Sequence, residues 1–351
     1  MYQAIITDRE AGQRFDKYLH RLLPNAGSGF LYKMLRKRNI TLNDKKADGS
    51  EKTVAGDCVK IFFAQETLNK FMGKVSEQSA DSSYFKSQEY RSAYRQFPDI
   101  RVVYENDHIL IADKPAGVLS QKAEKTDLSL NEWLIGYLLE KETLSGQEPA
   151  FYKPSVCNRL DRNTSGMVLC AKTLKGAQLL GGLLKERTLH KYYQLYVRGR
   201  IEEACLVEGY LVKDEKKNKV KIKPVPGKTD PGGGPDAGIQ KNAEDKKAAY
   251  IQTRYKPLKA EADKTLLEVE LITGKPHQIR AHLAGIGHPL LGDYKYGDRV
   301  WNEEYRRQFG VQSQLLHAYK VVFPPLDEPF TDLSGRTFFC ELPEIFGRIS
   351  R

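Results

Sequence analysis

The sequence lacks any hydrophobic stretch long enough to cross a membrane. No apolar run approaches the roughly 20 residues that a membrane-spanning helix needs. The N-terminal stretch MYQAIITDRE also lacks the basic and then apolar segments of a signal peptide. We therefore expect a cytoplasmic protein with no membrane partner.

Cysteine is scarce, with five residues in 351, and no C-x-x-C pair occurs. The sequence thus predicts neither a disulfide framework nor a cysteine-based zinc site, and we expect reduced, mostly buried thiols. His277, His282 and His288 lie near one another in the sequence. Their spacing does not place two imidazoles on one helical face, however, and no acidic ligand lies between them. We expect no metal site.

Acidic side chains are fewer than basic ones, 45 against 56, which gives a formal net charge of +11. Such a surface attracts polyanions, either nucleic acid or an anionic membrane. Hydrophobic residues make up 40% and charged residues 29% of the chain, as in ordinary folded proteins. The length favours about two domains.

The first 65 residues combine short helices and strands. Apolar residues at helical spacing predict helices over residues 14–24 and 29–39, and strands are expected at 40–44 and 58–63. A basic face on one helix is usually just solvated. This order of elements resembles the S4 RNA-binding domain over residues 1–65, however, and that resemblance implies that six basic residues bind RNA phosphates without reading sequence. They are Lys33, Arg36, Lys37 and Arg38 on the second helix and Lys45 and Lys46 in the following turn.

Residues 66–98 are polar, rich in serine and without clear periodicity, so we expect a polar linker there. The pattern from residue 99 to 351 predicts a second domain in which strands outnumber helices. We expect an α+β fold with a large mixed or antiparallel sheet flanked by helices. The segment 224–238 is rich in proline and glycine, which indicates a surface loop.

The stretch NRLDRNTSG places Asp161 between Arg159 and Arg162, in a polar loop before a predicted buried strand. Loops anchored on rigid structure commonly carry catalytic groups. The alternative is an Asx turn, in which Asp161 would only bind backbone amides.

Four stretches carry a family resemblance. In order and spacing, DKPAGVLSQ, NRLDRNTSGMVLCAK, HKYYQLYVRG and LITGKPHQIRAHLAGIGHPLLGDYKYG resemble the signatures of the RluA family of pseudouridine synthases. The resemblance covers residues 100–351, and an N-terminal S4 domain is frequent in that family. It implies isomerisation of uridine in RNA, with no metal, nucleotide or other cofactor. The lysine-rich segment 213–222 resembles the branch that acts on ribosomal RNA, while transfer RNA stays possible.

The resemblance also implies roles for individual residues. Asp161 corresponds to the essential carboxylate, which either attacks C1' of the ribose or removes the 2' proton, and the sequence leaves both routes open. Departure of uracil builds positive charge on the ribose, which an ionised carboxylate stabilises. Arg280 corresponds to the arginine that pairs with this aspartate, and Pro276 is expected in the first turn of its helix. A guanidinium favours the ionised form of a neighbouring carboxylate.

Other residues are implied to bind the RNA. Tyr193 corresponds to the tyrosine that stacks on the target base. Lys191 should share its strand face, with Tyr192 opposite. Arg159 corresponds to the arginine that fills the place of a flipped-out base, and Arg162 should contact RNA beside it. Three positions depart from the family, which most often has His at Asn158 and Arg-Thr at Lys275 and Pro276.

Two other functions remain open at this stage. A non-catalytic RNA-binding or ribosome-assembly protein could keep the fold, although the intact set of Asp161, Tyr193 and Arg280 disfavours it. A nucleic-acid N-glycosylase would share the flipped base and the carboxylate but would release free uracil. We expect a monomeric RNA pseudouridine synthase.

Overall fold

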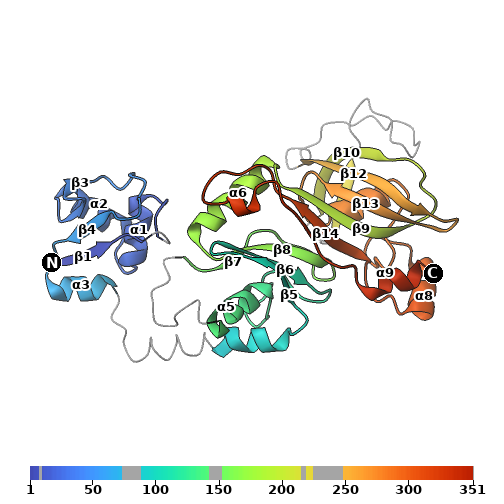
Figure 1. Cartoon of the computed structure of the whole chain (residues 1–351), viewed down its shortest axis with the longest axis horizontal. Coiled ribbons are helices and arrows are strands. Elements are labelled where there is room, and N and C mark those ends of the chain that lie inside the picture. Colours follow the sequence, from blue (N-terminus) through green and yellow to red (C-terminus); the bar gives the residue numbers. More distant parts are fainter. Residues whose placement is uncertain (8–9, 73–87, 142–151, 215–218, 224–247, 351) are drawn as a thin grey trace.

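The computed structural model describes residues 1–7, 10–72, 88–141, 152–214, 219–223 and 248–350. Within these residues the chain forms a four-stranded sheet, in the order β1-β4-β2-β3, and a larger sheet of eleven strands. The larger sheet runs β11-β10-β12-β13-β9-β14-β8-β6-β5, with β15 paired to β14 and β7 to β8 (Figure 1). The expected α+β class and the large mixed sheet are confirmed.

The N-terminal unit folds around its two predicted helices. Phe15 and Leu19 of the first helix and Leu31 and Leu35 of the second are at most 1% exposed and pack on Val59. The turn expected at Lys45 and Lys46 lies instead at Asn43 and Asp44, which adopt positive φ. Lys45 and Lys46 form strand β3. The elements are β1 (Tyr2–Ile5), α1 (Phe15–Leu22), α2 (Ser28–Arg36), β2 (Ile40–Leu42), β3 (Lys45–Lys46), β4 (Cys58–Ile61) and α3 (Gln65–Met72).

The linker expected over residues 66–98 is wrong at both ends. Helix α3 buries Leu68 against the N-terminal core, and Phe71 packs on Phe30 with ring centroids 4.4 Å apart. A second helix over residues 88–96 buries Ala93 and places Tyr94 beside Trp133. In α3 the residues Leu68, Phe71 and Met72 keep helical spacing, but the helix spans only eight residues and the stretch after it is polar, so the prediction missed it. Residues 73–87 lie outside the described part of the chain.

Strand β8 lies in the interior of the larger sheet, and all seven of its residues are buried. It pairs in parallel with β14 and antiparallel with β6. Gly166 has φ +108°, and a Cβ there would lie 2.4 Å from the Ala318 carbonyl oxygen, so only glycine permits this close pairing. The close pairing fixes where the chain leaves the 158–164 loop and enters the sheet.

Helices cover both faces of this part of the sheet (Figure 1). Alternate residues of β8 face opposite ways, so Val168 joins the core that contains Trp133 of α5, while Leu169 joins the core that contains Leu180 of α6. The elements are β5 (Arg101–Glu105), β6 (Ile109–Lys114), α5 (Leu130–Glu140), β7 (Ser155–Val156), β8 (Ser165–Ala171), α6 (Leu174–Glu186), β9 (His190–Arg198), β10 (Cys205–Asp214), β11 (Lys219–Lys223), β12 (Ala249–Ala260), β13 (Lys264–Leu271), α7 (Gln278–Gly285), α8 (Arg299–Phe309), β14 (Leu316–Val322), β15 (Thr337–Phe339) and α9 (Glu344–Ile349).

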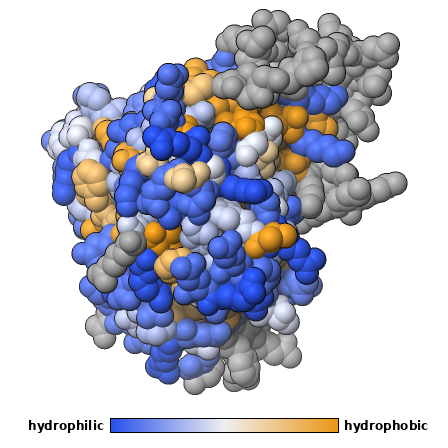
Figure 2. All heavy atoms as spheres, turned by 90° about the vertical axis from the view of Figure 1, so that its right-hand side faces the viewer, coloured by the Kyte–Doolittle hydropathy of each residue, from blue (hydrophilic) through white to orange (hydrophobic). Residues whose placement is uncertain are grey.

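Several expectations concern surface and composition. Among the described helices, none combines the length and apolarity that crossing a membrane requires, and hydrophilic side chains cover most of the face shown in Figure 2. All five cysteines are free, but Cys170 alone among them is fully buried and the other four are half-buried. The loop expected at 224–238 and part of the lysine-rich segment, residues 215–218, lie outside the described residues.

Candidate active site

A pocket opens where the loop before β8 meets strand β9 and the start of α7. Asp161 comes from the loop, Tyr193 from β9 and Arg280 from α7, so three segments distant in sequence converge. The lining residues are Arg159, Leu160, Asp161, Thr164, Tyr193, Leu271, Lys275, His277, Gln278, Ile279, Arg280 and Leu316.

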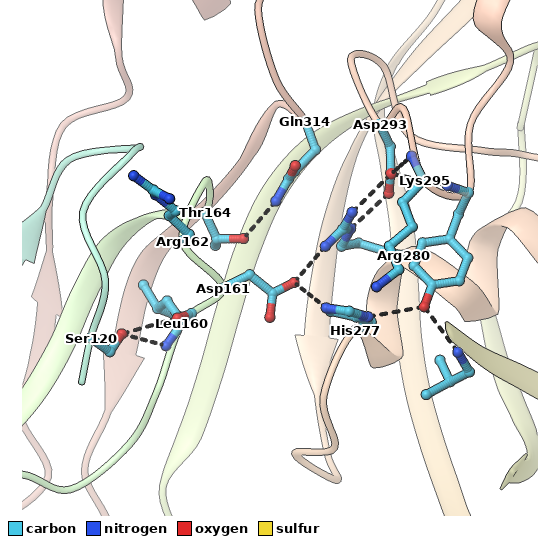
Figure 3. A network of polar contacts seen from close by, with 12 residues as sticks. Ser120, Leu160, Asp161, Arg162, Thr164, His277, Arg280, Asp293, Lys295 and Gln314 are labelled. Atoms are coloured by element: carbon cyan, nitrogen blue, oxygen red, sulfur yellow. Dashed lines mark hydrogen bonds and ion pairs between the residues drawn. The ribbon is translucent and has the colours of Figure 1, made fainter. Parts of the chain in front are cut away.

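Arg280 bridges two carboxylates at this pocket. Its Nη1 donates to Asp161 Oδ2 at 2.9 Å, while Nε and Nη2 donate to the two carboxylate oxygens of Asp293 at 2.7 and 2.9 Å (Figure 3). The Asp293 side chain is fully buried and that of Arg280 is 8% exposed, whereas the Asp161 side chain is 25% exposed. The outer carboxylate is thus the one that solvent or a ligand can reach.

The charges of the inner pair are strongly stabilised. Burial by itself would lower the pKa of Arg280, but hydrogen bonds and charge from Asp293 and Asp161 raise it overall. Burial would likewise raise the pKa of Asp293, but Arg280 and the backbone amides of Tyr296 and Lys295 lower it overall. Both groups therefore stay charged across the neutral pH range. Asp293 was not singled out from the sequence, where nothing separates it from an ordinary loop aspartate.

The start of α7 differs from the expectation. The helix begins at Gln278 rather than at Pro276, because His277 adopts a left-handed conformation with φ 55° that no α-helix continues. The Gln278 side chain anchors this start. Its Oε1 accepts from Thr273 Oγ1 at 2.9 Å, and its Nε2 donates to the Gln252 carbonyl at 2.9 Å.

His277 is a second residue that sequence reasoning missed as a neighbour of Asp161. Its Nε2 lies 3.9 Å from Asp161 Oδ2, and its Nδ1 lies 2.9 Å from the Tyr296 hydroxyl (Figure 3). Burial lowers the pKa of His277, with a further decrease from Arg280 and Lys295 that the charge of Asp161 opposes. The imidazole is therefore neutral at pH 7. A non-glycine residue at positive φ is strained, and such residues cluster at functional sites.

The stretch DKPAGVLSQ holds the Asp161 loop on both sides of the aspartate. The buried Lys114 Nζ donates to the carbonyls of Val118 and Arg162 at 2.8 and 3.1 Å. Ser120 Oγ donates to the Leu160 carbonyl and accepts from the Leu160 amide, both at 3.0 Å. Within the described residues, the Asp161 carboxylate binds the Arg280 guanidinium rather than backbone amides, so the Asx-turn alternative does not describe this loop.

Four other site residues were expected from the sequence. Tyr193 and Arg159 line the pocket, whereas Arg162 and Lys191 do not. Tyr193 is 4% exposed and lines the pocket, and burial followed by the charge of Asp161 raises its pKa. Arg159 is exposed and also lines the pocket. Arg162 instead points away, with Nε donating to the Gly117 carbonyl at 3.1 Å (Figure 3). Lys191 is outside the lining, and burial lowers its pKa.

The basic residues expected to bind RNA phosphates are exposed and lie in the N-terminal unit, outside this pocket. They are Lys33, Arg36, Lys37, Arg38, Lys45 and Lys46.

Asn158, which departs from the family, and the histidines His282 and His288 each have a local hydrogen-bond partner. Asn158 Oδ1 accepts from the Leu169 amide at 2.7 Å, so this departure supports the strand after the loop. His282 contacts Thr253 Oγ1, and His288 contacts the Arg198 carbonyl, both at 2.9 Å through Nδ1. Neither histidine converges with His277 on a common metal position.

The chain shares its sequence and fold with known RNA-modifying enzymes. Residues 108–285, about half of the chain, match the RNA pseudouridylate synthase family. A ribosomal large subunit pseudouridine synthase C from Vibrio cholerae is 30% identical over 319 residues, covering 91% of this chain and 87% of that protein. One from Escherichia coli is 28% identical over 320 residues, covering 91% and 87%.

A solved structure shows the same fold. The human RNA pseudouridylate synthase domain containing 4 superposes with a TM-score of 0.54 at 23% identity, covering 75% of this chain and 95% of that one. The sequence matches confirm the family resemblance that the four motif stretches indicated. The chain belongs to the RNA pseudouridylate synthase family and is an enzyme that isomerises uridine in RNA to pseudouridine.

Proposed function

We propose that Asp161 is the catalytic carboxylate of this isomerase and that it acts on a uridine flipped out of ribosomal RNA. One observation carries the proposal: the partly exposed Asp161 carboxylate lies in a pocket, 2.9 Å from a buried guanidinium that stays charged. Such a guanidinium keeps negative charge favourable beside the sugar even when bound RNA excludes water.

Two chemical routes use this carboxylate. In the first, Asp161 attacks C1' as the bond from C1' to N1 breaks, and C5 of the turned uracil later displaces it. In the second, Asp161 removes the proton from C2', the electron pair left there forms a C1'–C2' double bond, and the departing uracil takes the electrons of the C1'–N1 bond; when C5 bonds to C1', Asp161 returns the proton to C2'. In both routes C5 bonds to C1' and finally loses its proton. Positive charge that develops on the ribose is stabilised by Asp161.

The residues around Asp161 have different proposed roles. Arg280 orients the carboxylate through Nη1, while Asp293 holds Arg280 in place. Tyr193 offers an aromatic ring in the pocket wall for a pyrimidine. Arg159, exposed at the pocket rim, has the position and charge to enter the stack that a flipped uridine leaves.

The N-terminal unit, residues 1–65, is proposed to be an S4-like RNA-binding module. Its helix α2 and strand β3 carry exposed basic side chains, which attract phosphates irrespective of sequence. Ribosomal RNA is favoured over transfer RNA because the relatives from Vibrio cholerae and Escherichia coli are named for the large ribosomal subunit. We further propose a monomer that works in the cytoplasm.

The test is the substitution Asp161→Asn, which keeps the side-chain size and removes the negative charge. Pseudouridine formed in ribosomal RNA from a strain without the gene should fall at least about a thousandfold, with RNA binding near that of the wild type. Asp107→Asn, which changes an exposed aspartate between β5 and β6, is the matched control and should keep full activity. Substantial activity of Asp161→Asn would contradict the mechanism.

The same assay separates the other functions. A non-catalytic RNA-binding protein would bind RNA but form no pseudouridine, which is detected as a carbodiimide adduct that survives alkali. An N-glycosylase would release free uracil, which chromatography of the supernatant would detect.

A further inference from the structure

Three potential metal ligands meet on the side of the larger sheet that faces away from the pocket. Asp113 belongs to β6, His317 to β14, and Cys340 follows β15. One ligand atom from each, a carboxylate oxygen, an imidazole nitrogen and the thiol sulfur, lies within 4.8 Å of the other two. Leu316 lines the pocket, so its strand neighbour His317 points to the opposite face.

The imidazole is held in an orientation suited to a ligand. Its Nδ1 lies 2.8 Å from Ser165 Oγ, the first residue of β8, and its Nε2 lies 3.1 Å from Cys340 Sγ. Metal-bound histidines typically have their second ring nitrogen fixed by such a hydrogen bond, which sets the ring orientation. Nε2 therefore faces the thiol and the carboxylate, and a small widening of the contact with Sγ admits an ion.

The donor types and their charges fit one class of metal. Thiolate, imidazole and carboxylate are the ligands of Zn²⁺, whose sites are tetrahedral. A thiolate, a carboxylate and a neutral imidazole together balance a divalent ion, so no net charge would be left in the sheet. His317 is 1% exposed, whereas Asp113 and Cys340 are half-buried. Water can therefore reach a fourth position.

We propose that Asp113, His317 and Cys340 bind Zn²⁺, with a water molecule as the fourth ligand. On binding, the Cys340 thiol releases its proton to solvent and the sulfur bonds to the metal. The ion would tie the segment after β15 to β6 and β14, next to the residue that begins β8. The proposal goes beyond the isomerase function and does not depend on it.

The sequence-based expectation of no metal rested on the absence of a C-x-x-C pair and on the spacing of His277, His282 and His288. Asp113 and His317 are more than 200 residues apart in the sequence, so no local motif reveals the proposed ligand set. Pairing of β6 with β8, β8 with β14 and β14 with β15 brings them together.

The experiment uses the full chain, stripped with a chelator and titrated with Co²⁺, a spectroscopic substitute for Zn²⁺. We expect a single Co²⁺ per chain, with tetrahedral d–d bands and a thiolate-to-cobalt charge-transfer band that added Zn²⁺ abolishes. Cys340→Ser should lose the charge-transfer band. Cys58→Ser, which changes a half-buried thiol of β4, is the matched control and should keep it.

A second variant and a second measurement guard against misfolding of Cys340→Ser. Asp113→Asn nearly preserves size and should weaken Co²⁺ affinity at least about tenfold while keeping the charge-transfer band. Zn²⁺ should raise the Tm of the wild type and of Cys58→Ser, but not that of Cys340→Ser. Absence of the band in the wild type, or a band that Cys340→Ser leaves unchanged, would overturn the proposal. Neither result would bear on pseudouridine formation.

Discussion

Asp293 accepts two hydrogen bonds from Arg280, at 2.7 and 2.9 Å, and leaves Nη1 of that guanidinium to Asp161. The fully buried Asp293 thus fixes the orientation of the guanidinium that binds the partly exposed Asp161. A lone arginine on the helix could adopt several rotamers, whereas a guanidinium bound through two nitrogens is fixed as a plane.

Removing the inner carboxylate should therefore damage both stability and catalysis. Asp293→Ala leaves the buried Arg280 with one partner, and we expect a loss of about 3–5 kcal/mol in the free energy of unfolding. Urea unfolding of the variant measures this loss. Asp327→Asn, on an exposed aspartate, serves as control and should stay within about 0.5 kcal/mol of the wild type. An Asp293→Ala protein as stable as the wild type would show that Arg280 does not need this partner.

Arg280→Lys should separate charge from geometry. Lysine keeps the positive charge but cannot bind Asp293 through two nitrogens and Asp161 through a third. We expect kcat for pseudouridine formation to fall about a hundredfold, with a much smaller change in KM. Single-turnover kinetics measures the chemical step. An unchanged kcat would mean that charge alone suffices at this position.

His277→Gly tests the strained residue beside Asp161. Glycine adopts positive φ without cost, which offsets the loss of the imidazole contact with Tyr296. We expect the free energy of unfolding to stay within about 1 kcal/mol of the wild type while kcat falls about tenfold or more. Thermal unfolding and the pseudouridine assay are run on the same preparation. Full activity of the His277→Gly variant would show that the imidazole takes no part in catalysis.

The pH dependence of stability should contain a contribution from His282. Burial lowers the pKa of this histidine from 6.5 to about 4. Between pH 6.5 and 4 the unfolded chain therefore binds a proton that the folded chain does not, so stability falls as the pH falls, by at most about 1.4 kcal/mol per pH unit. His282→Gln should reduce this slope in urea unfolding relative to the wild type. Equal slopes in the variant and the wild type would contradict the assignment.

The basic surface of α2 should govern salt-dependent RNA binding. Charge reversal at Arg36 and Lys37 removes two exposed cations, so the slope of log K against log salt should become smaller by about 1.4–1.8. Arg299→Glu, on an exposed arginine at the start of α8, is the control outside this unit. A slope that the double variant does not change would mean that these two side chains, at the C-terminal end of α2, are only solvated.

The sequence by itself determined the strand β8, which is a continuous apolar run, and the amphipathic helices α1 and α2, whose apolar residues keep helical spacing. It also determined the family, because the long motif stretches around Asp161 and Arg280 keep their order and spacing. It failed for α3, whose apolar residues at helical spacing are confined to eight residues beside a polar stretch, and for the helix over residues 88–96.

Only the tertiary structure decided which distant side chains meet. Asp293 holds Arg280, His277 approaches Asp161, and Cys340 reaches His317 because strand pairing and the docking of α7 place them there. Local sequence records propensity and motif spacing, but a contact between separated segments depends on register and backbone conformation across the whole sheet. The left-handed turn at His277 is one such case, since nothing in its neighbourhood of the sequence requires it.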